Sequence, residues 1–134
     1  MSLSIRDMRS RAHQFVSTYA DEQKENAEAQ SFLNDLFNIF GIPRRRVASF
    51  ERPVKVDDKG TKRIDLFWPG LLLVEMKSEG QSLDRASKQA NNYLRGLTNE
   101  ELPRYVLVCD FKTFRLRDLE ANDKTDYEFE LVDL

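Results

Sequence analysis

The chain has 134 residues, of which 40% are apolar and 33% are charged, and its formal net charge at pH 7 is -2. These values are typical of a single soluble domain with one hydrophobic core, and they exclude a domain that holds nucleic acid by bulk positive charge. One cysteine and one histidine exclude an internal disulfide and zinc sites built on several His or Cys, and no apolar run reaches the roughly 20 residues of a membrane span. We therefore expect a cytoplasmic protein without membrane contact.

The N-terminal third has the periodicity of two helices. Apolar residues recur at helical spacing and predict helices over about residues 4–20 and 24–40. A capping pattern that begins at Ser4 marks the start of the first helix, and Gly41 and Pro43 mark the end of the second.

Three strands follow the second helix. Alternating or apolar runs predict them over residues 46–55, 62–68 and 71–77. The acidic, glycine-ended segment 57–60 is typical of a hairpin turn between the first two strands, and the Pro-Gly pair at 69–70 predicts a turn between the last two.

The C-terminal half contains one helix and three further strands. An apolar stripe predicts the helix over residues 82–97, and the strands are expected over 104–111, 113–119 and 127–132. The element order is α-α-β-β-β-α-β-β-β, without repeats or an internal linker. We therefore expect one α/β domain over residues 1–134, with a mixed central β-sheet flanked by helices.

Three charged residues stand in the two most apolar strands of the chain. Asp65 lies in one strand, and Glu75 and Lys77 share a face of the next. Because a buried ion costs several kcal/mol unless it is paired or binds metal, this pattern predicts a divalent metal site for phosphodiester hydrolysis. Asp65, Glu75 and the backbone carbonyl of Met76 would bind Mg²⁺, for which Mn²⁺ would substitute. Lys77 would hold the attacking water and stabilise the anionic transition state. A structural salt-bridged trio is the alternative.

The spacing of these residues resembles that of a known superfamily. Asp65, nine residues and then Glu75-Met76-Lys77 in a hairpin before an amphipathic helix is similar to the PD-(D/E)xK nucleases, although Ile64 stands where the superfamily name places proline. The surrounding residues, 63–70 and 72–78, resemble more narrowly the N-terminal endonuclease region of single-chain Type IIG, MmeI-like, restriction-modification enzymes.

This resemblance implies a restriction-endonuclease-like core and an endonuclease that cuts double-stranded DNA to 5′-phosphate and 3′-hydroxyl ends. Enzymes of this type continue into a helical spacer, an adenine-specific DNA methyltransferase and a target recognition domain. The chain is therefore expected to be the N-terminal fragment of a bifunctional defence protein. S-adenosylmethionine would bind only to the downstream methyltransferase, and two nuclease domains would pair transiently on DNA to cut both strands.

The resemblance also implies two further catalytic residues. The superfamily often supplies a first-helix glutamate to the metal or its water, and Glu28 lies one turn before Phe32 on the core-facing stripe. A solvated glutamate at a helix start is the alternative for Glu28, and Glu25 competes for the same role. Gln89 and Tyr93 resemble a Gln-x-x-x-Tyr motif that follows the catalytic lysine in several of these nucleases. A half-exposed glutamine beside a core tyrosine is the alternative there.

Basic side chains stand close to the candidate site. Residues 44–63 contain eight Lys and Arg against three acids, a stretch that can guide a phosphate backbone or serve only as a solvated surface. Ser78 and Lys88 are likewise candidates for phosphate contact. Two other functions remain open, a non-catalytic interaction or scaffold domain of the same fold and a stand-alone repair nuclease.

Overall fold

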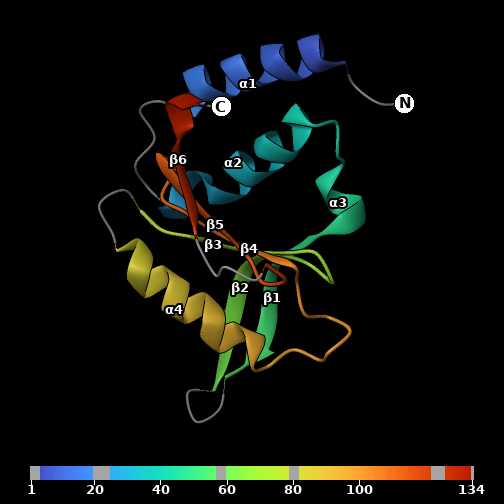
Figure 1. The fold of residues 1–134 in the computed structure, drawn as a ribbon, viewed down its shortest axis with the longest axis vertical. Helices are drawn as coiled ribbons and strands as arrows, with labels where there is room; N and C mark the ends of the chain where they lie inside the picture. Colours follow the sequence, from blue (N-terminus) through green and yellow to red (C-terminus); the bar gives the residue numbers. More distant parts are fainter. Residues whose placement is uncertain (1–3, 20–24, 57–59, 79–81, 122–125, 134) are drawn as a thin grey trace.

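A six-stranded sheet lies between helices on its two faces (Figure 1). The computed structural model describes residues 4–19, 25–56, 60–78, 82–121 and 126–133, and of residues 25–28 only the backbone. The helices are α1 (Ile5–Tyr19), α2 (Glu25–Ile39), α3 (Arg44–Val47) and α4 (Leu83–Leu94), with a 3-10 turn, η2, at Leu131–Asp133. The strands are β1 (Ser49–Lys55), β2 (Thr61–Trp68), β3 (Leu72–Met76), β4 (Tyr105–Cys109), β5 (Thr113–Asp118) and β6 (Tyr127–Glu130).

The strands lie in the sheet in chain order, from β1 to β6. All neighbours are antiparallel except β3 and β4, which are parallel because α4 crosses over between them. Helices α1 and α2 cover one face and α4 covers the other (Figure 1). The expected mixed α/β fold with a helix-flanked sheet is therefore confirmed.

Local signals explain where the first two helices begin and end. The Ser4 hydroxyl accepts a hydrogen bond from the Asp7 backbone N–H at 3.1 Å, as the capping pattern predicts. Gly41 has a φ of +73°, and the next N–H, of Ile42, donates to the Phe37 carbonyl at 3.1 Å. These bonds form a glycine-ended C-cap after α2. No helix in the described part of the chain is both long and apolar enough to cross a bilayer.

The sheet separates two apolar layers. The layer under α1 and α2 contains a cluster of aromatic rings, Phe15, Tyr19, Phe32, Phe111 and Phe114, whose neighbouring centroids lie 4.9–6.0 Å apart. The layer under α4 is aliphatic over most of its area, with Ala86, Ala90 and Tyr93 of the helix packed on Phe67, Leu73, Val106 and Val108. The single cysteine, Cys109, is buried in the first layer as a free thiol.

The predicted start of the first strand is wrong, because a short helix occupies that position. Residues 46–47, expected to start a strand, belong to α3, and β1 begins at Ser49. The Arg44 side chain holds this turn, since it donates to the Asn34 side chain at 2.8 Å and to the Ala48 carbonyl at 3.0 Å. Its guanidinium also lies 4.0 Å above the Phe50 ring. The contact with Asn34 of α2 is tertiary, so a strand-like local pattern could not reveal it.

Three other elements end two or three residues earlier than expected, among them β4, which ends at Cys109. Helix α4 ends at Leu94, and β6 ends at Glu130, after which the chain turns into η2. The N–H of Leu131 donates to the Lys112 carbonyl at 2.6 Å, and the Leu131 side chain is buried. This contact turns the chain inward and ends the strand.

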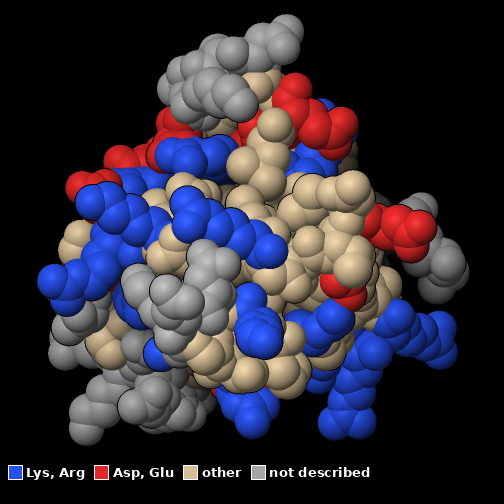
Figure 2. Space-filling model, turned by 90° about the horizontal axis from the view of Figure 1, so that it is seen from below, with Lys and Arg blue, Asp and Glu red and all other residues tan. Residues whose placement is uncertain are grey.

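Charge is unevenly distributed over the surface. The acidic C-terminal segment pairs with arginines of β5, since Arg115 contacts Glu128 at 2.9 Å and Arg117 contacts Asp126 at 2.7 Å. Figure 2 shows the molecule from below, where Lys and Arg side chains occupy much of the face and Asp and Glu lie mainly towards its upper rim.

Candidate active site

A tight turn sets the register of the two strands that carry the candidate acids. Gly70 has a φ of +79° after Pro69, and the Leu71 N–H donates to the Trp68 carbonyl at 3.0 Å, as in a type II turn. The resulting β2–β3 ladder runs from Trp68↔Leu72 to Leu66↔Val74. Continuing this register by one residue places Asp65 opposite Glu75, on the face of the sheet that α4 covers.

The backbone pairing between β2 and β3 stops where the acids begin. Beyond the Leu66↔Val74 pair, the Met76 N–H donates to the Asp65 Oδ2 atom at 2.7 Å. A carboxylate oxygen thus occupies the place of a strand partner, and this bond fixes the orientation of the Asp65 side chain.

Glu75 is a buried acid whose pairing is incomplete. Its exposed fraction is 3%, and its Oε1 atom has no hydrogen-bond partner among the atoms that the structure describes. Oε2 lies 3.5 Å from the Lys77 Nζ. Burial, followed by the negative charge of Asp65, raises the pKa of Glu75 to about 9, although the Lys77 ammonium opposes the shift. A second cation near Oε1 would satisfy this site.

Lys77 is held by a chain of side-chain hydrogen bonds. Its N–H donates to the Cys109 carbonyl at 2.8 Å, which continues the β3–β4 pairing and directs the side chain towards α4. There the Lys77 Nζ donates to Gln89 Oε1 at 2.8 Å, and Gln89 Nε2 donates to the Tyr93 hydroxyl at 2.7 Å. Burial and the nearby Glu75 carboxylate raise the pKa of Tyr93 above its ordinary value. The two α4 residues therefore belong to the same polar cluster as the acids.

The cap of α4 fixes the position of this pair. The Ser82 hydroxyl accepts from the Arg85 backbone N–H at 3.2 Å and so begins the helix. Gln89 and Tyr93 lie one turn apart on the resulting helix, at the edge of the stripe that packs on the sheet.

The structure thus brings together Asp65, Glu75, Lys77 and Gln89. The sequence had indicated these four candidates on two strands and a helix. The Met76 side chain is fully buried on the opposite face of β3, and its backbone carbonyl remains a predicted metal ligand. The side chain of Glu28 lies outside the described residues, so its predicted role also stays a prediction. Within the described ranges, no three His, Cys, Asp or Glu side chains are grouped so that they could hold a metal ion. The described donor set is therefore two carboxylates.

Sequence reasoning missed Arg85 and Asn92, two polar residues that lie beside this cluster. Lys62 of β2 and Arg85, Lys88 and Asn92 of α4 line a groove together with Gln89, Tyr93 and Val56. A signal was available, since residues 85, 88, 89 and 92 follow i, i+3, i+4, i+7 spacing and form one polar stripe on α4. Of the residues that line the groove, the sequence makes Lys88 and the stretch that contains Lys62 candidates for phosphate contact, and Gln89 a candidate for catalysis.

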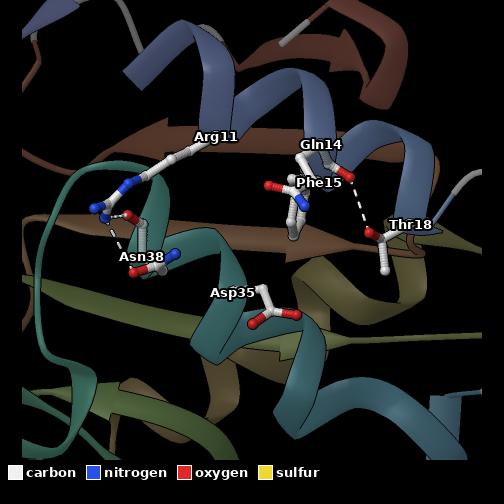
Figure 3. A pocket seen from close by; sticks show the side chains of 6 residues that line it. All are labelled: Arg11, Gln14, Phe15, Thr18, Asp35 and Asn38. Atoms are coloured by element: carbon white, nitrogen blue, oxygen red, sulfur yellow. Dashed lines mark hydrogen bonds between the residues drawn. The ribbon is translucent and has the colours of Figure 1, made fainter. Parts of the chain in front are cut away.

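Another cavity, of about 220 Å³, lies between α1 and α2 (Figure 3). The polar groups around it largely satisfy one another, because Arg11 Nη1 donates to the Asn38 carbonyl at 2.7 Å and to its side chain at 3.1 Å. Asp35 Oδ2 accepts from the Tyr19 hydroxyl at 2.6 Å. This cavity is on the α1–α2 side of the sheet, away from the acids, and nothing around it favours a reaction.

Comparisons with known proteins identify the family and the fold. The family model described as "MmeI, N-terminal domain" matches residues 8–134. A chain in a cryo-EM structure of a DrdV–DNA complex is similar in fold, with a TM-score of 0.53 and 14% sequence identity. The match covers 96% of the present chain and 12% of that chain. No curated protein matches the sequence. The chain belongs to the MmeI N-terminal domain family.

Proposed function

We propose that this domain is a Mg²⁺-dependent DNA endonuclease that belongs to the PD-(D/E)xK superfamily. The observation that carries the proposal is Glu75, which is buried beside Asp65 with one carboxylate oxygen unpaired and its pKa raised to about 9. The fold gains no stability from such a group, since a buried carboxyl without a partner is costly. A bound divalent cation would make this arrangement favourable.

The residues present fit Mg²⁺. This ion takes oxygen ligands, usually one or two carboxylates with water in the remaining positions, and Asp65 and Glu75 supply two. The Glu75 Oε1 atom is available because no described group occupies it. The backbone carbonyl of Met76 would add a third oxygen, and Mn²⁺ would substitute for Mg²⁺. When bound, the ion would supply a lowered pKa for water and neutralise charge on the phosphate.

The residues of the chain then have separate tasks. Asp65 is oriented by the Met76 N–H, so its free oxygen is preorganised as a ligand. Lys77, held by Gln89, would position the attacking water and stabilise charge on the phosphate. The water oxygen forms a bond to phosphorus and releases a proton to solvent, the bond from phosphorus to the 3′-oxygen breaks, and the departing 3′-oxygen takes up a proton. The products are a 5′-phosphate and a 3′-hydroxyl.

The family supports a wider setting for this activity. The chain spans 12% of the similar chain from the DrdV–DNA complex, so most of that polypeptide lies outside the matching domain. We place the domain at the N-terminus of a restriction-modification protein whose downstream methyltransferase uses S-adenosylmethionine and whose recognition domain chooses the site. Cutting both strands would take two copies that pair transiently on double-stranded DNA.

Calorimetric titration with Mn²⁺ and Mg²⁺ tests the metal site directly. The wild-type chain should show a site that is lost in Asp65→Asn, while Glu120→Gln, a change at an exposed acid 3.7 Å from Arg104, should retain it. A wild-type protein that releases no binding heat with either ion would favour the structural salt cluster of a scaffold domain.

Plasmid cleavage by the full-length polypeptide tests the lysine. Lys77→Ala should abolish cutting, while Lys55→Ala, which changes an exposed lysine of β1, should leave it intact. Equal cutting by the wild type and Lys77→Ala would remove Lys77 from the mechanism.

A further inference from the structure

A groove of about 420 Å³ runs beside the candidate active site, between α4 and the outer end of the β1–β2 hairpin. Three cations line it, Lys62 from β2 and Arg85 and Lys88 from α4. All three side chains are exposed, and the only acid on the described part of α4, Asp84, contacts Arg115 at 2.7 Å instead. Three cations and the amides of Gln89 and Asn92 therefore surround a groove whose lining also includes Val56 and Tyr93.

These three cations differ from several arginines on and beside the sheet, because those arginines have ionic partners. Arg104, Arg115 and Arg117 each contact a carboxylate, and so does Arg52, which pairs with Glu101. By contrast, Lys62, Arg85 and Lys88 form no ion pair with any residue that the structure describes. Unpaired like charges repel one another across a shared groove, so their grouping contributes nothing to folding. An anionic ligand bound in the groove would be stabilised by these three charges.

The groove is continuous with the acids through two shared residues. Gln89 and Tyr93 form part of its lining, and Gln89 also accepts the hydrogen bond from the Lys77 Nζ. A polyanion lying in the groove would therefore reach the amine that is 3.5 Å from Glu75. A ligand with repeated phosphates at nucleotide spacing fits this continuity better than a single small anion does.

We propose that this groove holds the sugar-phosphate backbone of one DNA strand next to the phosphate that is cut, with Lys62, Arg85 and Lys88 as phosphate contacts. The inference rests on the proposed function for the identity of the polyanion. Asn92, on the same stripe of α4, is placed to donate from its amide to a backbone oxygen. Such contacts position a strand without reading its sequence, in keeping with a domain whose target is chosen elsewhere.

An NMR titration of the chain with a short DNA duplex at low salt tests the proposal, because it locates even weak binding. Amide shifts should concentrate on residues 61–64 and 85–92 and be small on α1. The triple variant Lys62→Ala/Arg85→Ala/Lys88→Ala should lose these shifts, and the slope of log K against log salt should fall by about 2 to 3.

The matched control is Arg6→Ala/Arg9→Ala/Arg45→Ala, which removes the same charge from exposed residues of α1 and α3. It should retain the groove shifts and most of the salt dependence. Equal loss of affinity in the two triple variants would overturn the proposal, since binding would then follow net charge. Shifts centred on another surface, or no shifts at all, would overturn it as well.

The two proposals fail separately. Asp65→Asn should bind DNA in the groove as the wild type does while it loses the metal site. A chain that binds DNA in the groove but takes up no Mn²⁺ would support the groove and refute the nuclease. A chain that binds Mn²⁺ and shows no groove shifts would refute the groove alone.

Discussion

Replacing Glu75 with glutamine should stabilise the metal-free domain at neutral pH. Below its ordinary pKa of 4.5, Glu75 is protonated in both the folded and the unfolded chain, and the substitution should change the free energy of unfolding little. Between pH 4.5 and about 9, only the unfolded chain releases the proton, so the wild type loses stability as the pH rises. Above about 9 both states are ionised and the loss is constant.

The size of this effect follows from the width of the window. One proton contributes about 1.4 kcal/mol per pH unit, so over the roughly three units from 4.5 to about pH 7.5 the loss reaches about 4 kcal/mol. Glutamine has no ionisable proton and escapes this loss. For a domain of this length, the difference corresponds to a melting temperature roughly 15 °C higher at about pH 7.5.

Urea denaturation in the presence of a chelator, at about pH 5 and about pH 7.5, measures the difference. The gap in unfolding free energy between Glu75→Gln and the wild type should widen with pH, while Glu120→Gln, at an acid whose side chain is 68% exposed, should follow the wild type. Adding Mn²⁺ should then raise the stability of the wild type and leave that of Glu75→Gln unchanged. Parallel pH profiles for Glu75→Gln and the wild type would show that Glu75 is ionised at no cost, and the argument for a missing cation would be lost.

Three further substitutions test the surroundings of the site. Gly96→Ala should lower the unfolding free energy in urea by about 2 kcal/mol, because a Cβ there would overlap the Lys55 carbonyl and move α4 away from β1. Gln89→Ala should slow plasmid cleavage roughly 10- to 100-fold with unchanged Mn²⁺ affinity by calorimetry, since it frees the Lys77 amine; weaker metal binding would contradict this. Glu51→Val should cost about 2 kcal/mol and Glu51→Gly almost nothing in thermal melts, because residue 51 has a φ of +56°; equal costs would show that this backbone is unstrained.

The acids and the lysine could be placed from sequence because they are local to one hairpin. The Pro69-Gly70 turn fixes the register of β2 against β3, and a period of two residues then determines which side chains share a face. Helical spacing placed Gln89 beside the apolar stripe of α4, from which it reaches Lys77. Most of the candidate site residues could therefore be placed from short-range geometry.

The sequence could not show which Lys and Arg side chains form ion pairs, because their partners lie far along the chain. The sequence leaves open whether the basic stretch 44–63 guides a phosphate backbone or is a solvated surface, and its members separate in the fold. Arg44 is bonded to α2 and Arg52 to Glu101, 49 residues later, while Lys62 faces the groove. The acidic tail has a specific task as well, since Asp126 and neighbouring acids pair with the arginines of β5. Only the fold shows which charges remain available to a ligand.

Three features that lower the stability of the fold lie close together in the sheet. In the β1–β2 register, Glu51 lies opposite Asp65, and this residue has the left-handed backbone that side chains other than glycine disfavour. One strand further on, Glu75 is buried with an unpaired oxygen, and the β2–β3 ladder has just ended. A sequence selected for stability alone would remove each of these features with a single substitution. Because all three adjoin the same pair of carboxylates, the proposed metal site would account for them together.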